Sequence, residues 1–328
     1  MSVRGGRRRS LRRPLVIAGG YAIAAAAMAW AVWLARDSTL GQRPTALRWG
    51  FVAAAVAADV ATYACQALRW RLLLRGAGRL SWFAAARAIY IGLFVSEVLP
   101  MRPGEGVRAW LAARELHTPI AAVVPSIVVE RFFDAVLLAV SVGVATMLVP
   151  MPASFVAAGR TLGAGVVAAA IALGFAIVRG KPIERDGAQE SRIRSTLRDL
   201  AGGIREIGLA RTTLAAFVLS CLLLAGQILA FWLAMRASGI DRSLALAAGV
   251  LTLVHLGTAV PATPGNAGTF QVFVILGLML FGVEGGAAAA FSIAGFVILT
   301  APLWLLGGLA MGLAASQLPV GSRLNLEP

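Results

Sequence analysis

The sequence predicts an all-α, polytopic membrane protein that folds as a bundle of transmembrane helices. Of its 328 residues, 59% are hydrophobic and 14% are charged, with a mean hydropathy of +0.81. A soluble domain carries about 25% charged residues, which it needs to cover its surface. Apolar runs of about 20 residues, the length that crosses a bilayer, recur along the chain. Two segments, 100–104 and 261–265, share the pattern P-x-x-P-G inside apolar sequence.

Six apolar runs are long enough to cross a bilayer completely. The first follows the arginine-rich segment 4–13 and exceeds the roughly 7–15 apolar residues of a cleaved signal. We therefore expect it to stay as an uncleaved helix. The six predicted spans are 14–35, 46–68, 119–149, 161–178, 211–235 and 287–313.

The remaining apolar stretches, 82–116 and 243–282, each contain one P-x-x-P-G segment. Proline removes an amide donor and glycine permits a tight turn, so each segment should end one helix and begin another. We predict two re-entrant hairpins that leave the membrane on the side they entered. Broken helices at matching positions in two halves are typical of a transporter site.

The distribution of lysine and arginine sets the predicted orientation. If both bent stretches are hairpins, the N-terminus, segment 69–87, the loop 179–211 and the C-terminus lie on one side with most of the basic residues. The positive-inside rule makes that side cytoplasmic. If the first bent stretch instead crossed the membrane once, this bias would collapse. We therefore predict a protein of the cell inner (cytoplasmic) membrane with both termini cytoplasmic.

This topology divides the chain into two membrane halves of opposite orientation, an inverted repeat. Inside the loop 179–211, segment 188–208 carries apolar residues at helical spacing between arginines, which predicts an amphipathic helix. It either lies flat on the membrane surface or packs on the bundle. The predicted parts are a basic N-terminus 1–13, a first half 14–150, a second half 151–315 and a tail 316–328.

Charges cluster at membrane depth around the first bend, where charged side chains are costly and usually functional. Glu130 lies about 16 Å along its helix, near the midplane, and shares a helix face with Asp134. The cluster is either a brace between hairpin and helix or a clamp for a phosphate. Arginine suits the clamp because its planar fork grips phosphate in a bidentate way, and the helix beginning at Gly104 adds positive potential. The candidates are Glu97, Arg102, Glu105, Arg108, Glu130, Arg131 and Asp134.

The second bend carries no charge. Its candidate binding residues, for which a simple packing turn is the alternative, are Pro264, Gly265, Asn266, Gly268 and Thr269, with Gln271 close by.

Three further residues are candidates for proton coupling: Asp59, Glu97 and His255. Asp59 either pairs with an arginine of the first hairpin or carries a proton. His255 is either a hydrogen-bonded interior histidine or a proton carrier, and we favour the former. Arg69, beside Trp70 at a helix end, is expected to anchor the helix at the membrane interface.

Several function classes have no support. Two cysteines and two histidines, spread along the chain, predict neither a metal site nor a disulfide, and no cofactor motif is present. We find no phosphate-cradling glycine loop and no catalytic-serine or zinc-protease motif. The net charge of +15 comes from arginines at the ends of apolar runs, which suits lipid headgroups rather than nucleic acid.

Four ordered motifs resemble the lysylphosphatidylglycerol synthase transmembrane-domain family of flippase-like membrane proteins. They are Leu68-Arg69-Trp70, Leu99-Pro100-x-Arg102-x-Gly104-Glu105-x-x-Arg108, Glu130-Arg131-x-x-Asp134 and Pro261-x-x-Pro264-Gly265-x-x-Gly268-Thr269-Phe270. The resemblance covers about residues 14–315 and implies handling of an amphiphilic lipid with a polar headgroup. It carries over as site residues the charged residues of the second and third motifs and Pro264, Gly265, Gly268 and Thr269.

Two departures qualify what the resemblance implies. Gln271 stands where the family often has glutamate, which argues against an acid role there. We also expect no soluble acyltransferase domain after residue 315, so synthesis of an aminoacyl lipid is not expected.

The predicted function is a membrane lipid translocase, without enzymatic activity, that moves an anionic or sugar-bearing headgroup between the two hairpins. Its expected partners are the lipid substrate and the bilayer; no protein partner is identified. One alternative is a secondary transporter of a small anion. The other is an intramembrane enzyme acting on polyprenyl-phosphate lipids, for which carboxylates are present but no nucleophile motif.

Overall fold

The structure, a computed structural model, describes residues 25–26, 28–35, 47–99, 103–148, 153–179, 211–259 and 263–316. All regular elements in these ranges are helices. Three of them, Trp49–Gly76, Arg211–Ala237 and Gly285–Ala314, are long and apolar enough to cross a membrane. The prediction of an all-helical membrane protein is therefore confirmed in its coarse form.

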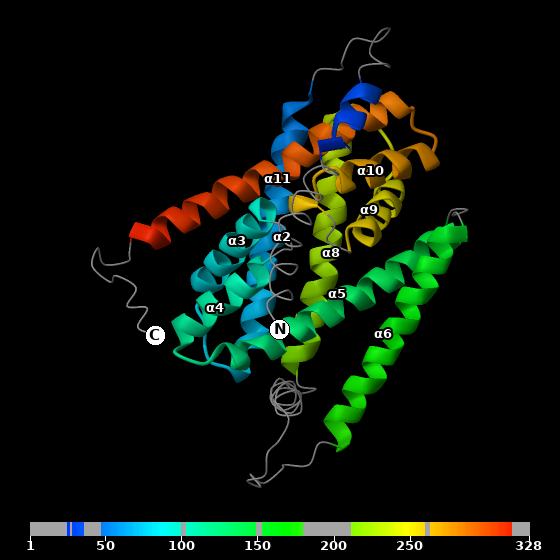
Figure 1. The fold of residues 1–328 in the computed structure, drawn as a ribbon. Coiled ribbons are helices and arrows are strands. Elements are labelled where there is room, and N and C mark those ends of the chain that lie inside the picture. Colours follow the sequence, from blue (N-terminus) through cyan, green and yellow to red (C-terminus); the bar gives the residue numbers. More distant parts are fainter. Residues whose placement is uncertain are drawn as a thin grey trace, which may run out of the picture.

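Two antiparallel helices, α2 (Trp49–Leu73) and α8 (Arg211–Ala237), form the centre of the bundle and make its most extensive contact (Figure 1). The start of α2 meets the end of α8, where the Arg48 amide donates to the Ala237 carbonyl at 3.0 Å. The Arg48 guanidinium also makes a bidentate ion pair with Asp241, with both N–O distances 3.0 Å. Close packing at the crossing needs Gly226, because a β-carbon there would overlap the Thr62 hydroxyl.

Each central helix leads into a helical hairpin. After α2 and a short 3-10 turn η1 (Leu74–Gly76) come α3 (Trp82–Val98) and α4 (Gly104–Leu116). After α8 come α9 (Leu244–Thr258), the 3-10 turn η2 (Pro264–Asn266) and α10 (Thr269–Leu280). Both hairpins begin with a serine N-cap, since Ser81 accepts from the Ala84 amide and Ser243 from the Leu246 amide.

Both P-x-x-P-G segments break the helix, as predicted. α3 ends before the first and α4 begins at its glycine, while η2 replaces a helical turn at the second. The first hairpin closes tightly because Gly92 faces Gly104, where a β-carbon on either would overlap the other's carbonyl oxygen.

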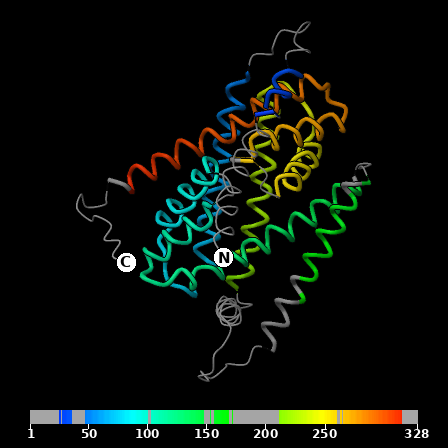
Figure 2. The backbone as a smooth tube through the Cα atoms, in the orientation of Figure 1, coloured from blue at the N-terminus to red at the C-terminus, as the bar shows by residue number. Residues whose placement is uncertain are grey.

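Three longer helices follow these hairpins in the chain: α5 (Ile120–Leu148), α6 (Ala153–Arg179) and α11 (Gly285–Ser316). α11 packs along α3 and α10, α5 packs against α9 and α4, and α6 packs mainly on α5. The tube in Figure 2 shows the coloured part of α6 at the edge of the bundle, beside α5.

Sequence reasoning placed most of these helices to within a few residues; α6 begins eight residues before its predicted span. The first predicted span is described only as helix over 25–26 and 28–35. The basic N-terminus 1–13, the amphipathic segment 188–208 and the tail beyond 316 lie outside the described residues.

Candidate functional site

A polar stripe on α2 runs through the otherwise apolar bundle. Asp59, Tyr63, Gln66 and Arg69 follow one another at spacings of three or four residues, so they share one helix face. This face looks toward α5 and α9, and two polar cavities open along it. The stripe therefore organises the candidate site.

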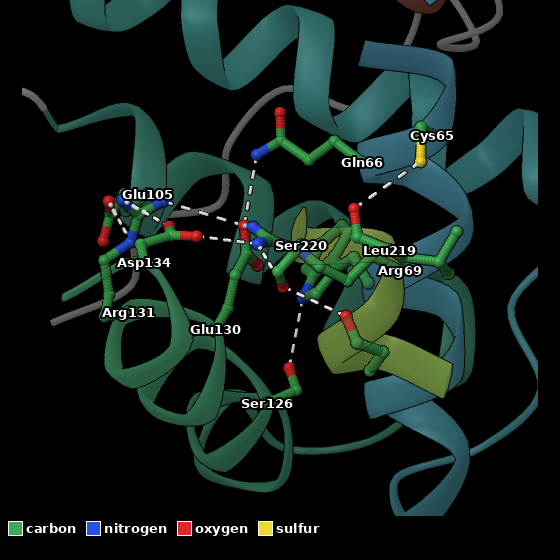
Figure 3. A network of polar contacts seen from close by, with 12 residues as sticks. Cys65, Gln66, Arg69, Glu105, Ser126, Glu130, Arg131, Asp134, Leu219 and Ser220 are labelled. Carbon is green, nitrogen blue, oxygen red and sulfur yellow. Dashed lines mark hydrogen bonds and ion pairs between the residues drawn. The ribbon is translucent and has the colours of Figure 1, made fainter. Parts of the chain in front are cut away.

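The buried centre of the site is the ion pair between Arg69 on α2 and Glu130 on α5 (Figure 3). Arg69 Nη2 lies 2.7 Å from Glu130 Oε1, and the two side chains are 3% and 0% exposed. The other arm of Arg69, Nη1, donates to Asp134 Oδ1 at 2.7 Å and to the Ser220 hydroxyl of α8 at 2.9 Å. One arginine thus joins three helices.

Arg108 of α4 brings the first hairpin to the same carboxylate. Its guanidinium lies 3.1 Å from Glu130 Oε2 and donates to Oε1 at 3.2 Å. The guanidinium also lies over the ring of Trp70, 5.0 Å from the ring centroid, and the negative face of the ring attracts its positive charge. Trp70 is itself buried and donates to the Ser126 hydroxyl at 3.1 Å, while Gln66 donates to Glu130 at 3.1 Å. We call Arg69, Arg108 and Glu130 the brace.

Arg131 forms a second, more accessible group beside the brace. Its side chain is 49% exposed and makes ion pairs with Glu105 of α4 at 3.1 Å and with Asp134 at 3.3 Å. Glu105 and Asp134 are 48% and 36% exposed, in contrast to the buried Glu130. We call Arg131, Glu105 and Asp134 the outer cluster. The three arginines and three acids of the two groups balance in charge.

The first cavity, of about 490 Å³, lies against the outer cluster. Arg131, Asp134 and Arg69 line one part of its wall. Leucines of α5, α6 and α8, such as Leu138, Leu162 and Leu223, line another part. The cavity therefore offers charged and apolar surface side by side.

The second bend lies close to the first hairpin. α3 packs against η2, and Gly265, with φ at +57°, lies so near Glu97 that a β-carbon would meet its carboxylate. The Gly268 amide donates to Gln271 at 2.7 Å, and the hydroxyls of Thr263 and Thr269 share a hydrogen bond of 3.2 Å. These bonds close the turn on itself, whereas Asn266 Oδ1 accepts no hydrogen bond from the described residues. Pro264 starts η2.

The second cavity, of about 200 Å³, brings together the candidates for proton coupling. Asp59, Glu97 and His255 all line it, together with Gly265 and Asn266 of the second bend. Asp59 has no ion-pair partner among the described residues, so its predicted pairing with a hairpin arginine is not seen there. The described residues also provide no hydrogen bond to His255, and our preference for an interior histidine over a proton carrier stays a prediction. Tyr63, Gln227, His255 and Thr258 line both cavities.

The structure corrects the role expected of Arg69 and brings together most of the predicted charged cluster. Arg69 was expected to be an interfacial anchor, but it is 2% exposed and holds the brace together. Its helical spacing from Asp59, Tyr63 and Gln66 is the signal that could have revealed this. Of the predicted cluster, Glu105, Arg108, Glu130, Arg131 and Asp134 come together, whereas Glu97 lies at the second cavity. Arg102 lies outside the described residues.

The site lies within a region of the chain that a family model matches. A family model described as "Lysylphosphatidylglycerol synthase TM region" matches residues 17–307. The chain belongs to this family. A similar curated protein is the UPF0104 membrane protein of Methanothermobacter thermautotrophicus (strain Delta H). It is 24% identical over 266 residues, which cover 76% of this chain and 79% of the relative. No solved structure matches the chain. Both polar cavities lie within the family region.

Proposed function

We propose that this member of the family is a lipid translocase of the cell inner membrane. It would move an anionic or sugar-bearing headgroup through the polar cavities while the chains stay in the bilayer. The observation that carries the proposal is the 490 Å³ cavity, where Arg131 and Asp134 lie beside leucines of three helices. A phosphate group can bind to the charged part of this wall, and a hydrocarbon chain can pack against the leucines.

Helix contacts support an inverted repeat behind this function. α11, the last helix of the second half, packs on the first hairpin through α3, and α5 packs on the second through α9. The hairpins open at opposite ends of the antiparallel α2–α8 pair. In transporters such halves alternate access around a central site. We place the termini in the cytoplasm on the arginine distribution.

The second half supports a role for the charges beyond bracing. Phe231 precedes Ser243 by the same number of residues as Arg69 precedes Ser81. Phe231 packs edge-on against Phe291 of α11, with 5.3 Å between the ring centroids. At the corresponding position of the first half, Arg69 pairs with Glu130 instead. An aromatic pair therefore joins the equivalent helices of the second half. Because apolar packing suffices for that junction, the charges of the first half are better explained by a polar substrate.

We assign different tasks to the two groups. The brace holds α2, α4 and α5 together, and Arg69 also adds its positive charge to the cavity wall. Arg131, half exposed on the cavity, is free to exchange one carboxylate for a phosphate. We rank transport above catalysis because Glu130 and Asp134 each contact two or more arginines. An enzyme would need a carboxylate that is available to the substrate, whereas these two are held by arginines.

The decisive test uses purified protein in liposomes with labelled lipids of several headgroups: an anionic phospholipid, a sugar-phosphate polyprenyl lipid and an uncharged lipid. We expect exchange between leaflets of an anionic or sugar-phosphate lipid, its loss in Arg131→Ala, and wild-type exchange in Arg87→Ala. Arg87 is a matched control because it forms a surface ion pair with Glu115 away from the cavities.

Two further measurements in the same vesicles separate the rival functions. Uptake of radiolabelled inorganic phosphate without lipid exchange would favour a small-anion transporter. Mass spectrometry that detects chemical conversion of the polyprenyl lipid would favour the intramembrane enzyme. Either result in place of lipid exchange would overturn the proposal.

A further inference from the structure

The second cavity contains a buried carboxylate that neither the brace nor the outer cluster uses. Asp59, in the middle of α2, is only 6% exposed and lines the cavity. Its Oδ2 is buried and accepts no hydrogen bond from the described residues. Every other buried or half-buried acid of the first half whose partners are described, such as Glu130 and Asp134, is held by an arginine. Asp59 is the exception among them.

An ionised, unpaired carboxylate at this place is energetically unfavourable. Moving an isolated charge out of water is so costly that such a group usually becomes neutral instead. Within a membrane protein, an acid of this kind that faces a cavity marks an ion or proton pathway. We propose that Asp59 is a proton-binding site that couples proton movement to transport, an inference that rests in part on the proposed function.

The groups around Asp59 suit a proton. Titratable neighbours are Tyr63 on its own helix, Tyr90 and Glu97 of α3, and His255 of α9. From α8, η2 and α11 come the uncharged Gln227, Asn266 and Thr300. Among the described residues no arginine or lysine lines this cavity. A proton can therefore neutralise Asp59, and imidazole, the side chain of the adjacent His255, is the group that exchanges protons between about pH 5 and 8.

The position of the cavity links the proton to the headgroup. It shares Tyr63, Gln227, His255 and Thr258 with the cavity of the outer cluster. His255 and Asp134, a member of that cluster, both line the cavity of the outer cluster. Protonation of Asp59 neutralises one negative charge beside the shared wall, which lowers the repulsion that an incoming phosphate meets. The proton enters on the Asp59 carboxylate and leaves from the resulting acid on the other side, so charge and atoms balance.

Infrared spectroscopy tests the proton site without reference to transport. Purified protein in lipid nanodiscs is titrated with acid, and the C=O stretching band of protonated carboxylic acids is recorded. We expect one pH-dependent component of this band to be lost in Asp59→Asn and retained in Asp241→Asn, which changes an exposed acid in a loop. Asp59→Glu should keep a band but shift its frequency or titration midpoint, which covers the case that the asparagine variant fails to fold. An unchanged band in Asp59→Asn, or a band abolished by sodium ions at constant pH, would overturn the proposal.

Vesicles with an imposed pH gradient test the coupling. In the wild-type protein we expect the gradient to shift the final distribution of labelled lipid between leaflets. Asp59→Asn should still let the lipid equilibrate but should lose the response to the gradient. A gradient response preserved in Asp59→Asn, or a wild-type protein that exchanges lipid indifferently to the gradient, would overturn coupling. A wild-type protein that exchanges no lipid under any condition would instead contradict the proposed function, while the infrared result still decides the proton site.

Discussion

Arg69 and Glu130, separated by 61 residues in sequence, form the most deeply buried ion pair of the described structure at 2.7 Å. The pair joins α2 to α5, and Arg108 brings α4 to the same carboxylate. Arg131 follows Glu130 directly in sequence yet is half exposed on the cavity. This difference in burial separates residues that hold the site from residues that meet the substrate.

Arg69→Ala should destabilise the protein much more than Arg131→Ala. Removing one member of a buried ion pair costs about 3–5 kcal/mol, because it leaves the other charge buried without a partner. A half-exposed pair contributes roughly 0–1 kcal/mol. Thermal unfolding in detergent should show a large fall in Tm for Arg69→Ala and a small one for Arg131→Ala. Equal losses would contradict the division into brace and outer cluster.

Replacing the whole brace by apolar residues should keep the fold and abolish transport. The triple variant Arg69→Met, Glu130→Leu, Arg108→Met removes all three charges together, so no buried charge is left alone, and such exchanges are often neutral or stabilising. We expect a Tm near that of the wild type, since Asp134 keeps Arg131 as its partner. Lipid exchange in vesicles should be lost because the cavity no longer carries the field of these arginines. Wild-type exchange by this variant would mean that the brace has only a structural role.

Arg131→Lys should fold normally but exchange lipid slowly. Lysine keeps the positive charge yet cannot reproduce the planar fork that grips a phosphate through two hydrogen bonds. The rate of lipid exchange, compared with that of Arg87→Lys, checks this. A full rate in Arg131→Lys would show that a point charge is sufficient.

Gly265→Ala should damage the junction between the two bends. The residue has a φ of +57°, which costs an alanine about 1–2 kcal/mol, and its β-carbon would meet Glu97. Gly106→Ala is the matched control, because α4 has open space at that position and alanine favours a helix over glycine by up to about 1 kcal/mol. Tm should fall in the first variant and stay equal or rise in the second. The reverse order would exclude close contact at the bend.

Cysteine labelling should place the open ends of the two hairpins on opposite sides of the membrane. In a background with Cys65→Ala and Cys221→Ala, a cysteine replacing Arg114 should react from the cytoplasm, and one replacing Glu284 from outside. The impermeant reagent is applied to intact cells and then to inverted vesicles. Reaction of both positions from one side would rule out the inverted repeat.

The ion pair at the junction of α2 and α8 should give a pH-dependent contribution to stability. Asp241 lies in the loop between α8 and α9, and the hydrogen bond from Arg48 lowers the pKa of its carboxyl group. A lowered pKa means that the stabilisation is present above the unfolded pKa of about 3.9 and is lost as pH falls through the folded value. The Tm difference between the wild type and Asp241→Asn should therefore be small near neutral pH and vanish in acid. A difference that grows in acid would contradict this assignment.

Sequence alone determined the helices and their breaks, because these depend on local chemistry. Proline and glycine at 100–104 and 261–265 prevent a continuous helix, and serine caps fix where α3 and α9 begin. The length of the apolar runs predicted α2, α5, α8 and α11, since a helix needs about 20 apolar residues to cross a bilayer. The clustering of Glu130, Arg131 and Asp134 near Arg108 also followed from helix period and hairpin geometry.

Only the tertiary structure decided which charges are paired. Whether Arg69 reaches the membrane surface or turns inward depends on the approach of α5 and α8, which supply Glu130, Asp134 and Ser220. Likewise, Arg69 lies on the same helix face as Asp59, ten residues further along, but Arg69 forms its ion pairs with Glu130 and Asp134 of α5. Ion pairing depends on distances of a few ångströms between helices far apart in sequence, and helix period by itself does not specify them.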